Sequence, residues 1–292
     1  MIKCGIDLGG NWAKISIMDT ITLDQLYTES INYKVRKSYD SNNNIPEYKI
    51  KEIIEVINYF KDKAYQYEAN SIYAAATGGI RQASNSKEVI DRINNETGIT
   101  VKLITGFDEA NYTWRGALLS FNDVNKRYVE IDIGSSTTEI SYGVLDRILK
   151  STSINTGSAI LNDLYNLYKR NINNKELDYI FYYLDEQFKN INIPYSNNNV
   201  YILTGSAGFS SLIYNDKRLT SDYIKSKPLW NITFEMVKNC LSYSMKNNLN
   251  TNDDTRLSCN IILYHLMQKL KIKNINYSTL GLRHGMMLIM KK

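Results

Sequence analysis

The feature that most constrains this chain is a short pattern that occurs twice, in which an apolar segment reaches an aspartate and then enters a turn of small residues. The first copy is IDLGGN at residues 6–11, and the second is IDIGSST at residues 131–137. Each reads as a buried strand followed by a tight turn. Because the copies lie about 125 residues apart, they indicate a duplicated domain rather than one large sheet.

Length and composition agree with two globular domains. The chain has 292 residues, of which 43% are hydrophobic, and this is enough for two domains of about 100 to 200 residues each. It contains no apolar run of about 18 residues. Its first residues, MIKCGIDLGG, lack a basic region followed by an apolar core. We therefore expect a cytoplasmic protein that does not enter a membrane.

Charge and cysteine content narrow the possible ligands only slightly. The net charge of +5 suits a polyanionic ligand, although an ordinary solvated surface gives the same value. The sequence contains no recognisable nucleic-acid recognition module, so we expect no specific nucleic-acid partner. The three cysteines, Cys4, Cys240 and Cys259, lack the pair spacing of a zinc site. We expect them to be small buried hydrophobic residues.

Hydrophobic periodicity predicts strands and helices on either side of the two turns. Isoleucines at positions 50, 53, 54 and 57 recur at helical spacing with Phe60, and a second helix is expected to stop at Gly98. The first two strands form a hairpin whose turn follows Asp7. Strands are expected at residues 2–7, 12–18, 71–76, 101–104, 128–133 and 200–203, and further helices at residues 160–168 and 261–270.

The turns themselves suggest a ligand. A turn of glycine and serine after a strand presents backbone N–H groups that the sheet leaves unused, and such groups bind phosphate oxygens. An aspartate at the end of the strand is suited to holding Mg²⁺. A third turn of this kind, TGSAG, occupies residues 204–208. One such turn is most often purely structural, but three in order favour a phosphate site. The candidate phosphate-binding residues are Gly9, Gly10, Asn11, Gly134, Ser135, Ser136, Thr137, Thr138, Gly205 and Ser206.

These motifs together resemble those of the actin-like ATPase superfamily, which includes sugar kinases and chaperone ATPases. DLGGNW at residues 7–12 resembles its first phosphate loop, and DIGSSTTE at residues 132–139 resembles its second. ILTGSAG at residues 202–208 is similar to the third turn of that superfamily.

Further blocks narrow the resemblance to one family. ATGGIRQASN at residues 76–85, followed by TGFDEANYTWRGA at residues 105–117, resembles the exopolyphosphatase/guanosine-pentaphosphatase (Ppx/GppA) family. Arg256 before a long helix and STLGLRHGM at residues 278–286 resemble the ending of that family. The ordered blocks cover nearly the whole chain, so their joint occurrence is much more specific than any one of them.

The resemblance implies roles for several side chains. Glu109 matches the general base that activates the attacking water, while the adjacent Asp108 stands at a less constrained position of the block. An acidic pair is also common at a helix start for purely structural reasons. Arg81 matches an arginine whose guanidinium can hold a phosphate bidentately, with a surface salt bridge as the alternative. Asp132 and Glu139 match the acidic residues of the second loop, and Glu139 could instead simply pair on its strand.

The resemblance also implies a cofactor and an architecture. Mg²⁺ or another divalent cation is expected on Asp7, Asp132 and Glu139. The fold class is α/β, with two ribonuclease-H-like domains, each a mixed five-stranded sheet flanked by helices. Domain I is expected at residues 1–118, rejoined by residues 281–292, and domain II at residues 119–280. The active site is expected in the cleft between the domains.

The function implied is a Mg²⁺-dependent phosphohydrolase that releases terminal phosphate from inorganic polyphosphate. A guanosine pentaphosphate 5′-phosphohydrolase is an alternative within the family, and the sequence does not separate the two substrates. A sugar or small-molecule kinase of the same fold is another, and a non-catalytic sensor of phosphate ligands is a further one. A homodimer is possible, and the sequence does not decide the oligomeric state. Larger members of the family append helical C-terminal domains, so we expect this chain to prefer shorter polyphosphates.

Several positions depart from the pattern of the family. Gly10 and Trp12 stand where serines are usual in the first loop, and Ser135 and Ser136 replace two glycines of the second. His284 stands where glutamate is common. We expect the other histidine, His265, to be structural because it lies within an apolar helix.

Overall fold

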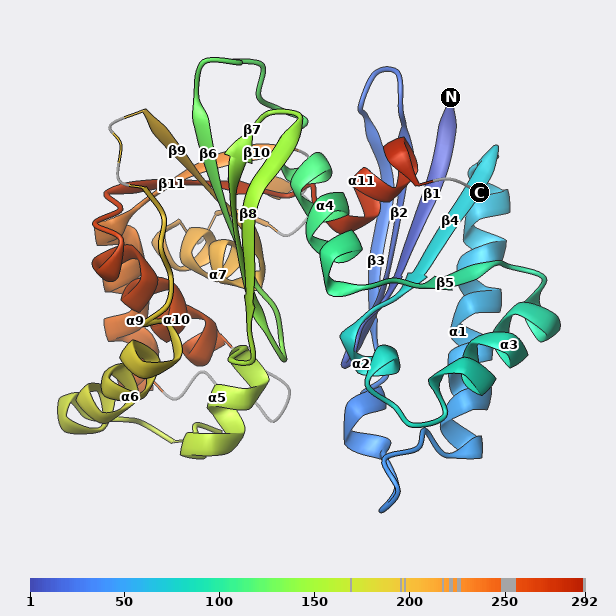
Figure 1. Cartoon of the computed structure of the whole chain (residues 1–292), viewed down its shortest axis with the longest axis horizontal. Helices are drawn as coiled ribbons and strands as arrows, with labels where there is room; N and C mark the ends of the chain where they lie inside the picture. The colour runs from blue at the N-terminus through green and yellow to red at the C-terminus, as the bar shows by residue number, and fades with distance from the viewer. Residues whose placement is uncertain are drawn as a thin grey trace. The chain divides into compact units, whose positions relative to one another are not determined.

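The computed structural model describes residues 1–168, 170–194, 196, 198–216, 218–220, 223–224, 227–247 and 256–290. The chain forms two compact units, each of which is a sheet flanked by helices (Figure 1). Unit 1 comprises Met1–Gly116 and Leu280–Lys292, and unit 2 comprises Ala117–Thr279. The two sheets of a duplicated α/β fold, expected from the repeated strand-and-turn pattern, are confirmed.

The sheet of unit 1 has the strand order β3-β2-β1-β4-β5. Its strands are β1 (Ile2–Leu8), β2 (Trp12–Asp19), β3 (Gln25–Asn32), β4 (Ser71–Ala76) and β5 (Val101–Leu103). The expected hairpin is present, because β1 and β2 pair antiparallel from Ile2↔Asp19 to Leu8↔Ala13. On its other side β1 pairs parallel with β4, and β4 pairs parallel with β5. The central strand β1 therefore carries Asp7 to one end of a mixed sheet.

Apolar helix faces cover this sheet. The helical elements of unit 1 are η1 (Val35–Ser38), α1 (Glu47–Gln66), α2 (Gly78–Arg81), α3 (Ser86–Thr97), α4 (Gly106–Ala117) and α11 (Leu282–Ile289). The isoleucines that predicted α1 are buried together with Phe60 in the core of unit 1. Helix α11 returns from the end of the chain to β1, where Lys3 Nζ donates to the Met287 carbonyl at 2.8 Å.

The sheet of unit 2 has the order β10-β11-β9-β6-β7-β8. Its strands are β6 (Arg127–Ile133), β7 (Thr138–Val144), β8 (Arg147–Ile154), β9 (Asn199–Gly205), β10 (Leu229–Thr233) and β11 (Asn274–Ser278). It has six strands, one more than expected, because β10 adds to the edge of the sheet by pairing antiparallel with β11. Strand β6 repeats the position of β1, since it is antiparallel to β7 and parallel to β9.

The two faces of β6 differ in character. Val129, Ile131 and Ile133 alternate into the apolar core of unit 2, whereas Glu130 and Asp132 lie on the opposite face, since successive side chains of a strand point to opposite sides. The helices described in this unit are α5 (Ser158–Tyr165), α6 (Asn174–Gln187), α7 (Ser206–Asn215), α9 (Phe234–Asn247) and α10 (Arg256–Lys269). Most residues of α10 are buried in this core.

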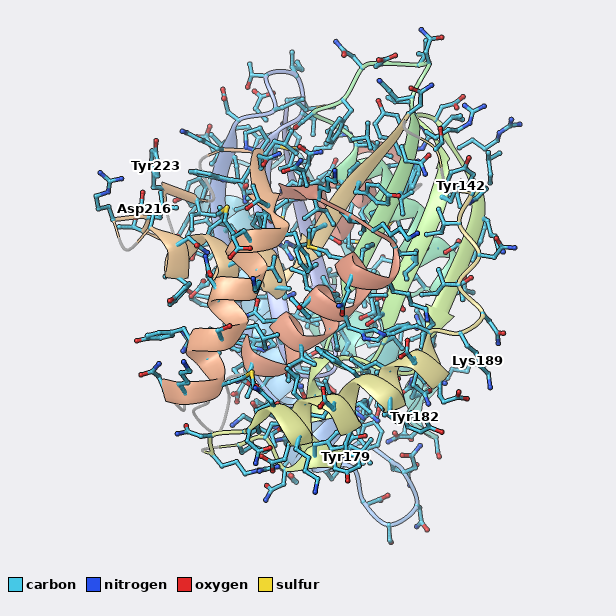
Figure 2. All side chains as sticks on the ribbon, turned by 90° about the vertical axis from the view of Figure 1, so that its left-hand side faces the viewer. Tyr142, Tyr179, Tyr182, Lys189, Asp216 and Tyr223 are labelled. Atoms are coloured by element: carbon cyan, nitrogen blue, oxygen red, sulfur yellow. The ribbon has the colours of Figure 1, made fainter. Side chains whose placement is uncertain are left out.

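Smaller expectations are also met. Cys4, Cys240 and Cys259 are buried. His265 of α10 is 5% exposed, with its Nε2 atom 3.4 Å from Asp185 Oδ1. On the outer side of α6, Tyr179 and Tyr182 project into solvent (Figure 2). Within the part of the chain that the structure describes, no helix is both long and apolar enough to cross a membrane.

Candidate active site

The turn between β1 and β2 is the first candidate phosphate site. It is closed by a bond from Gly9 N–H to the Trp12 carbonyl at 3.0 Å, and Gly9, Gly10 and Asn11 are half-buried. Asn11 Oδ1 is a buried oxygen without a hydrogen-bond partner among the described residues. The turn is thus a compact, polar and partly accessible feature at the end of the central strand.

Asp7 lies directly before this turn and is 9% exposed. It pairs with Lys14 across the β1–β2 ladder, and Thr77 Oγ1 lies 3.5 Å from Asp7 Oδ1. Burial raises the pKa of Asp7, while Lys14, Arg283 and the Thr77 hydroxyl oppose that increase. Sequence reasoning did not single out Lys14, although its position seven residues after Asp7 in a hairpin places the two side chains on one face.

The turn between β6 and β7 repeats this design. Gly134 N–H donates to the Thr137 carbonyl at 2.9 Å, the counterpart of the Gly9–Trp12 bond. The carbonyls of Gly134 and Ser135 accept from N–H groups at the start of α5, at 2.9 Å from Ser158 and 2.8 Å from Ala159. The duplication seen in the sequence therefore extends to the hydrogen bond that closes each turn.

The side chains of this second turn are not equivalent. Ser135, Ser136 and Thr137 are half-buried in the turn. Thr138 is fully buried, and its hydroxyl donates to the Thr156 carbonyl at 2.6 Å. Its hydroxyl proton is therefore used in a contact within unit 2, and the binding of phosphate by Thr138 stays a prediction.

Two of the predicted acidic residues face each other in unit 2. Asp132 and Glu139 are direct partners in the β6–β7 ladder, which puts their side chains on one face of the sheet. Ser153 of the neighbouring strand β8 donates to Glu139 Oε1 at 2.7 Å. Both acidic residues are half-buried. The strand pairing thus brings together two residues that are seven positions apart in the sequence.

A third acidic residue on this face, Glu130, was not predicted from the sequence. Glu130 is completely buried, and its Oε1 accepts from the Thr204 hydroxyl at 2.9 Å. Its Oε2 has no partner among the described residues. Burial raises the pKa of Glu130 well above its ordinary value, and the charges of Asp132 and Glu139 raise it further. The sequence did contain a signal for this position, because Glu130 and Asp132 are two residues apart in a strand and therefore share one face.

The third turn follows β9, which pairs parallel with β6 so that Ile133 lies opposite Gly205. Gly205 has a φ of 85° and caps the start of α7. A Cβ atom at Gly205 would lie 2.8 Å from the Ile133 carbonyl oxygen and 3.2 Å from Asp132 Oδ1. Glycine is therefore required here by both its backbone angle and the space available. Ser206 is the first residue of α7, and its side chain lies outside the described part.

Arg81 and Glu109 form a contact within unit 1. Arg81 ends the short helix α2, and Glu109 lies in the first turn of α4. Arg81 Nη1 donates to Glu109 Oε2 at 3.0 Å and to the Ile104 carbonyl at 2.8 Å. The side chains are 30% and 25% exposed, respectively. The carboxylate is thus held by one guanidinium but remains open to solvent.

The neighbouring Asp108 has a different geometry. Its Oδ2 accepts from the Thr105 hydroxyl at 2.7 Å and from the Thr105 N–H at 3.2 Å, while Thr105 Oγ1 accepts from Asp108 N–H at 3.1 Å. This reciprocal pair satisfies N–H groups at the start of α4, as a capping box does. Asp108 therefore has a local structural task, the capping of α4.

His284 takes over the capping position at the start of α11. Its Nδ1 accepts from the Gly281 N–H at 3.1 Å, and its Nε2 has no partner among the described residues. Burial, together with the neighbouring charge of Arg283, lowers the pKa of His284 to about 3. A neutral imidazole can accept this bond. The departure from glutamate at this position therefore preserves the cap.

The donor set for a metal is limited. No group of three or more His, Cys, Asp or Glu side chains among the described residues is arranged to hold a metal ion. Asp132 and Glu139 do offer adjacent carboxylates, and Mg²⁺ is commonly held by one or two carboxylates together with substrate phosphates and water. Their donor chemistry fits Mg²⁺. Asp7 lies in unit 1, and its part in holding the metal stays a prediction.

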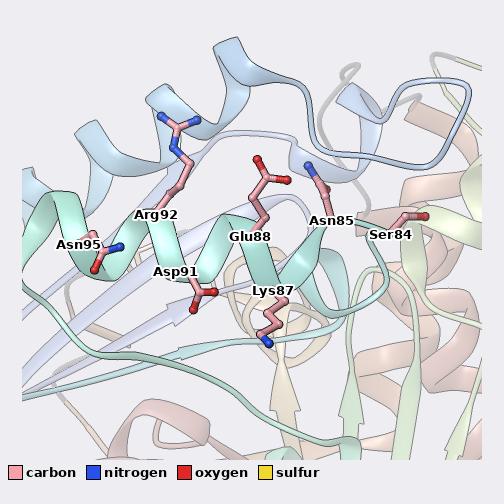
Figure 3. A pocket seen from close by; sticks show the side chains of 7 residues that line it. All are labelled: Ser84, Asn85, Lys87, Glu88, Asp91, Arg92 and Asn95. Carbon is pink, nitrogen blue, oxygen red and sulfur yellow. The ribbon is translucent and has the colours of Figure 1, made fainter.

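One surface hollow is lined by none of these residues. It has a volume of about 570 Å³ and is formed along α3 (Figure 3). Its lining residues are Ser84, Asn85, Lys87, Glu88, Asp91, Arg92 and Asn95. Arg92 is engaged there by Glu47 and Glu96. Two acids offset the two cations of this hollow, so it does not suit a polyanion.

The chain was compared with protein-family models and with curated proteins. The model of the Ppx/GppA phosphatase family matches residues 15–292. A bifunctional 3-dehydroquinate synthase/phosphatase of Fusobacterium nucleatum is 26% identical over 267 residues, which are 84% of this chain and 39% of that protein. Exopolyphosphatase 1 of Mycobacterium leprae is 25% identical over 142 residues, which are 48% of this chain and 42% of that protein. The chain thus spans less than half the length of these relatives.

Solved structures share the fold. The Ppx/GppA phosphatase of Aquifex aeolicus, in its type II variant, matches with a TM-score of 0.81 at 18% identity, over 99% of this chain and 100% of that chain. An exopolyphosphatase from Cytophaga hutchinsonii matches with a TM-score of 0.80 at 19% identity, over 98% and 96%. These likenesses show the two-domain actin-like fold. Since the family model covers almost the entire chain, the protein is a member of the Ppx/GppA phosphatase family.

Proposed function

We propose that this protein is a Mg²⁺-dependent phosphohydrolase that releases terminal phosphate from inorganic polyphosphate. The observation that carries the proposal is the pairing of Glu109 with Arg81, at 3.0 Å. Hydrolysis of a phosphoanhydride requires one oriented carboxylate beside groups that neutralise phosphate charge. Glu109 is oriented by an arginine and is part exposed, whereas Asp108 is used to cap α4.

In the proposed reaction, Glu109 accepts a proton from a water molecule as the water oxygen attacks the terminal phosphorus. The bond between that phosphorus and the bridging oxygen breaks, and the bridging oxygen leaves as the new end of the shortened chain. The products are inorganic phosphate and polyphosphate with one unit fewer. Orientation of the water by a fixed carboxylate supplies most of what the protein must add, because the leaving phosphate is already a good leaving group.

The turns after β1, β6 and β9 are proposed to hold the phosphate groups. Their backbone N–H groups are suited to anions, and Gly9, Gly10, Asn11, Gly134, Ser135, Ser136, Thr137, Thr138, Gly205 and Ser206 remain the candidates. We place Mg²⁺ on Asp132 and Glu139, which lie opposite each other in the ladder. When bound, the ion neutralises charge on the phosphate oxygens. A shared site in the cleft between the domains stays a prediction.

The names of the relatives support the substrate class. Besides exopolyphosphatase 1 of Mycobacterium leprae, a guanosine-5′-triphosphate,3′-diphosphate pyrophosphatase of Vibrio cholerae is 25% identical over 144 residues, which are 49% of this chain and 29% of that protein. Both names describe cleavage of phosphoanhydrides. Guanosine pentaphosphate is therefore the second candidate substrate. A kinase and a non-catalytic sensor remain outcomes of the test.

The test compares phosphate release from tripolyphosphate, longer polyphosphate, guanosine pentaphosphate and ATP with a sugar acceptor, with and without Mg²⁺. Glu109→Gln is expected to lower kcat by about 100-fold to 10,000-fold, the usual loss of a general base. Asp108→Asn is the matched control and is expected to stay within about threefold of the native rate. Absence of release by the native protein, or full activity of Glu109→Gln, would reject the proposal. ADP that forms only with an acceptor would identify a kinase.

A further inference from the structure

The carbonyl groups of the first phosphate turn are all bound by one short segment. Gly9 O accepts the Tyr33 hydroxyl at 2.6 Å. Gly10 O accepts Arg36 N–H at 3.0 Å, and Asn11 O accepts the N–H groups of Tyr33 and Lys34 at 3.0 and 3.1 Å. Three consecutive carbonyls are thus turned toward residues 33–36.

This arrangement determines where the amides of the turn point. In a trans peptide the C=O of one residue and the N–H of the next point in opposite directions. Binding the carbonyls of Gly9 and Gly10 therefore turns the N–H groups of Gly10 and Asn11 away from residues 33–36. Neither N–H has a backbone partner among the described residues. Successive N–H groups on one side of a turn form a concave site for an anion.

The segment that binds the turn is itself held in place. Tyr33 is 1% exposed, and its own carbonyl accepts from Lys49 Nζ at 2.7 Å. Lys34 has a φ of 48° in the left-handed region, a backbone conformation that is strained for a non-glycine residue and persists only where surrounding contacts impose it. Residues 33–39, which we call the brace, therefore form a fixed support rather than a loose loop.

The brace also contacts α2, which in turn packs against the phosphate turn. The Tyr39 hydroxyl donates to the Gly79 carbonyl in α2. A Cβ atom on Gly79 would lie 2.0 Å from Gly10 Cα and 2.6 Å from Gly10 N, so the two backbones touch. Gly79 stands two residues before Arg81, which binds Glu109. The brace, the phosphate turn and the support of the proposed base are therefore one connected structure in unit 1.

The carbonyls of the second phosphate turn are also bound, but by different donors. Its Gly134 and Ser135 carbonyls are bound by backbone N–H groups of α5, and the Ser158 hydroxyl adds a second bond to the Gly134 carbonyl at 3.2 Å. In unit 1 the bond to the Gly9 carbonyl comes from a side chain, the Tyr33 hydroxyl. A single substitution can remove that bond without altering the backbone or the aromatic ring. The effect of the brace on the first turn can therefore be tested by a mutation that leaves the fold of the turn intact.

We propose that the brace sets the affinity of the first phosphate turn for anions, and that Tyr33 is its positioning residue. The inference rests on the proposed function for the identity of the substrate, an inorganic polyphosphate or the polyphosphate part of a nucleotide. Tyr33 acts through the Gly9 carbonyl and makes no contact with substrate. It keeps the Gly10 N–H directed at the bound phosphate, and the Arg36 N–H of the same brace, which binds the Gly10 carbonyl, does this for the Asn11 N–H.

The test is Tyr33→Phe, which removes one hydroxyl and keeps the ring. Tyr128→Phe is the matched control, because Tyr128 is also 1% exposed and its hydroxyl donates to a loop carbonyl, that of Asp123, at 2.9 Å. Both variants lose one part-buried hydrogen bond to a carbonyl, so both are expected to lose similar stability. Only Tyr33→Phe is expected to raise KM for tripolyphosphate, by about tenfold, the equivalent of one such bond. Its kcat is expected to stay within about twofold of native.

Binding is measured in parallel so that the result does not depend on turnover. Titration calorimetry of tripolyphosphate, on the Glu109→Gln background, is expected to show about tenfold weaker binding with Tyr33→Phe and no change with Tyr128→Phe. Equal binding by both variants, or a fall in kcat with unchanged KM, would overturn the role of the brace. Failure of the proposed hydrolysis is seen separately, as absence of phosphate release by the native protein.

Discussion

Arg81 and Glu109 are joined by a hydrogen-bonded ion pair in which Arg81 Nη1 lies 3.0 Å from Glu109 Oε2. The same nitrogen donates to the Ile104 carbonyl at the end of β5. Arg81 therefore ties the start of α4 to the edge of the sheet. The sequence suggested that Arg81 binds substrate phosphate, and this geometry adds a second role, that of orienting the carboxylate.

Arg81→Lys separates these two roles. Lysine keeps the positive charge but lacks the planar guanidinium that is held between Ile104 and Glu109. If Arg81 orients Glu109, kcat for phosphate release is expected to fall by about 100-fold with little change in KM, because a small displacement of a catalytic group has an effect of that size. Steady-state rates with tripolyphosphate measure both constants. An increase in KM with an unchanged kcat would instead assign Arg81 to phosphate binding.

Asp132→Asn tests the proposed metal site. The substitution removes one of two adjacent carboxylates while keeping the size of the side chain. The Mg²⁺ concentration that gives half-maximal activity is expected to rise by about tenfold or more, because hard cations prefer charged oxygen ligands. Rates are measured across a Mg²⁺ titration after treatment with a chelator. Glu186→Gln, an exposed position paired with Lys189, is the control. An unchanged Mg²⁺ requirement in Asp132→Asn argues against this placement.

Glu130→Gln is expected to stabilise unit 2 at neutral and alkaline pH. Burial, Asp132 and Glu139 raise the pKa of Glu130 in the folded state, whereas the unfolded chain has the ordinary value near 4.3. The folded state therefore holds its proton more tightly, and native stability is lost as the pH rises from about 4.3 toward the raised pKa. Glutamine does not titrate and can still accept from the Thr204 hydroxyl.

Urea unfolding of both proteins at pH 5, 6.5 and 8, in Mg²⁺-free buffer, measures this effect. The gain of Glu130→Gln over the native protein is expected to grow with pH, by at most about 1.4 kcal/mol per unit. A gain that is constant across this range, or a loss that grows with pH, would show that the carboxyl is not held in its neutral form.

His284 predicts the opposite pH dependence. Burial and Arg283 lower the pKa of His284 to about 3, below the value near 6.5 of an unfolded chain. The unfolded state then binds the proton more readily, so native stability is expected to fall as the pH drops from about 6.5 toward 3. His284→Gln keeps an acceptor for the Gly281 N–H and does not titrate.

The free energy of unfolding of the native protein and of His284→Gln is measured at pH 7 and at pH 4.5. Because both proteins carry the same carboxyl groups, the difference between their two losses reports the titration of His284 alone. The variant is expected to lose less stability over this interval, by about 2 to 3 kcal/mol. His265→Gln is a useful comparison, because burial also lowers the pKa of His265, while Asp185 opposes that change. Parallel curves for the native protein and His284→Gln would disprove the assignment.

The sequence alone was sufficient for several local elements of this protein. The hairpin around Asp7, the helix that buries Ile50 and Phe60, and the repeated turn after β6 are encoded by periodicity and glycine placement over short stretches. Ordered motifs also identified the family. These features depend on residues that are close in the sequence, so they could be predicted without the tertiary structure.

The sequence could not give the contacts between distant segments. That Thr138 turns its hydroxyl inward, that Asp132 lies opposite Glu139, and that β10 extends the second sheet all depend on strand pairing. Cross-strand partners are set by register and packing, which no local pattern fixes. The side-chain candidates were therefore predictable as residue types, but their partners were not.

The repeated strand, aspartate and turn determined that the chain would form two similar units with phosphate-type turns. Only the tertiary structure decided how the first of those turns is supported, by Tyr33 from 24 residues further along the chain. It also decided that Arg81 reaches Glu109, which is 28 residues away. A strand-turn pattern fixes backbone shape through local sterics, whereas the direction of its N–H groups and the placement of a catalytic carboxylate depend on hydrogen bonds that exist only once the whole unit has packed.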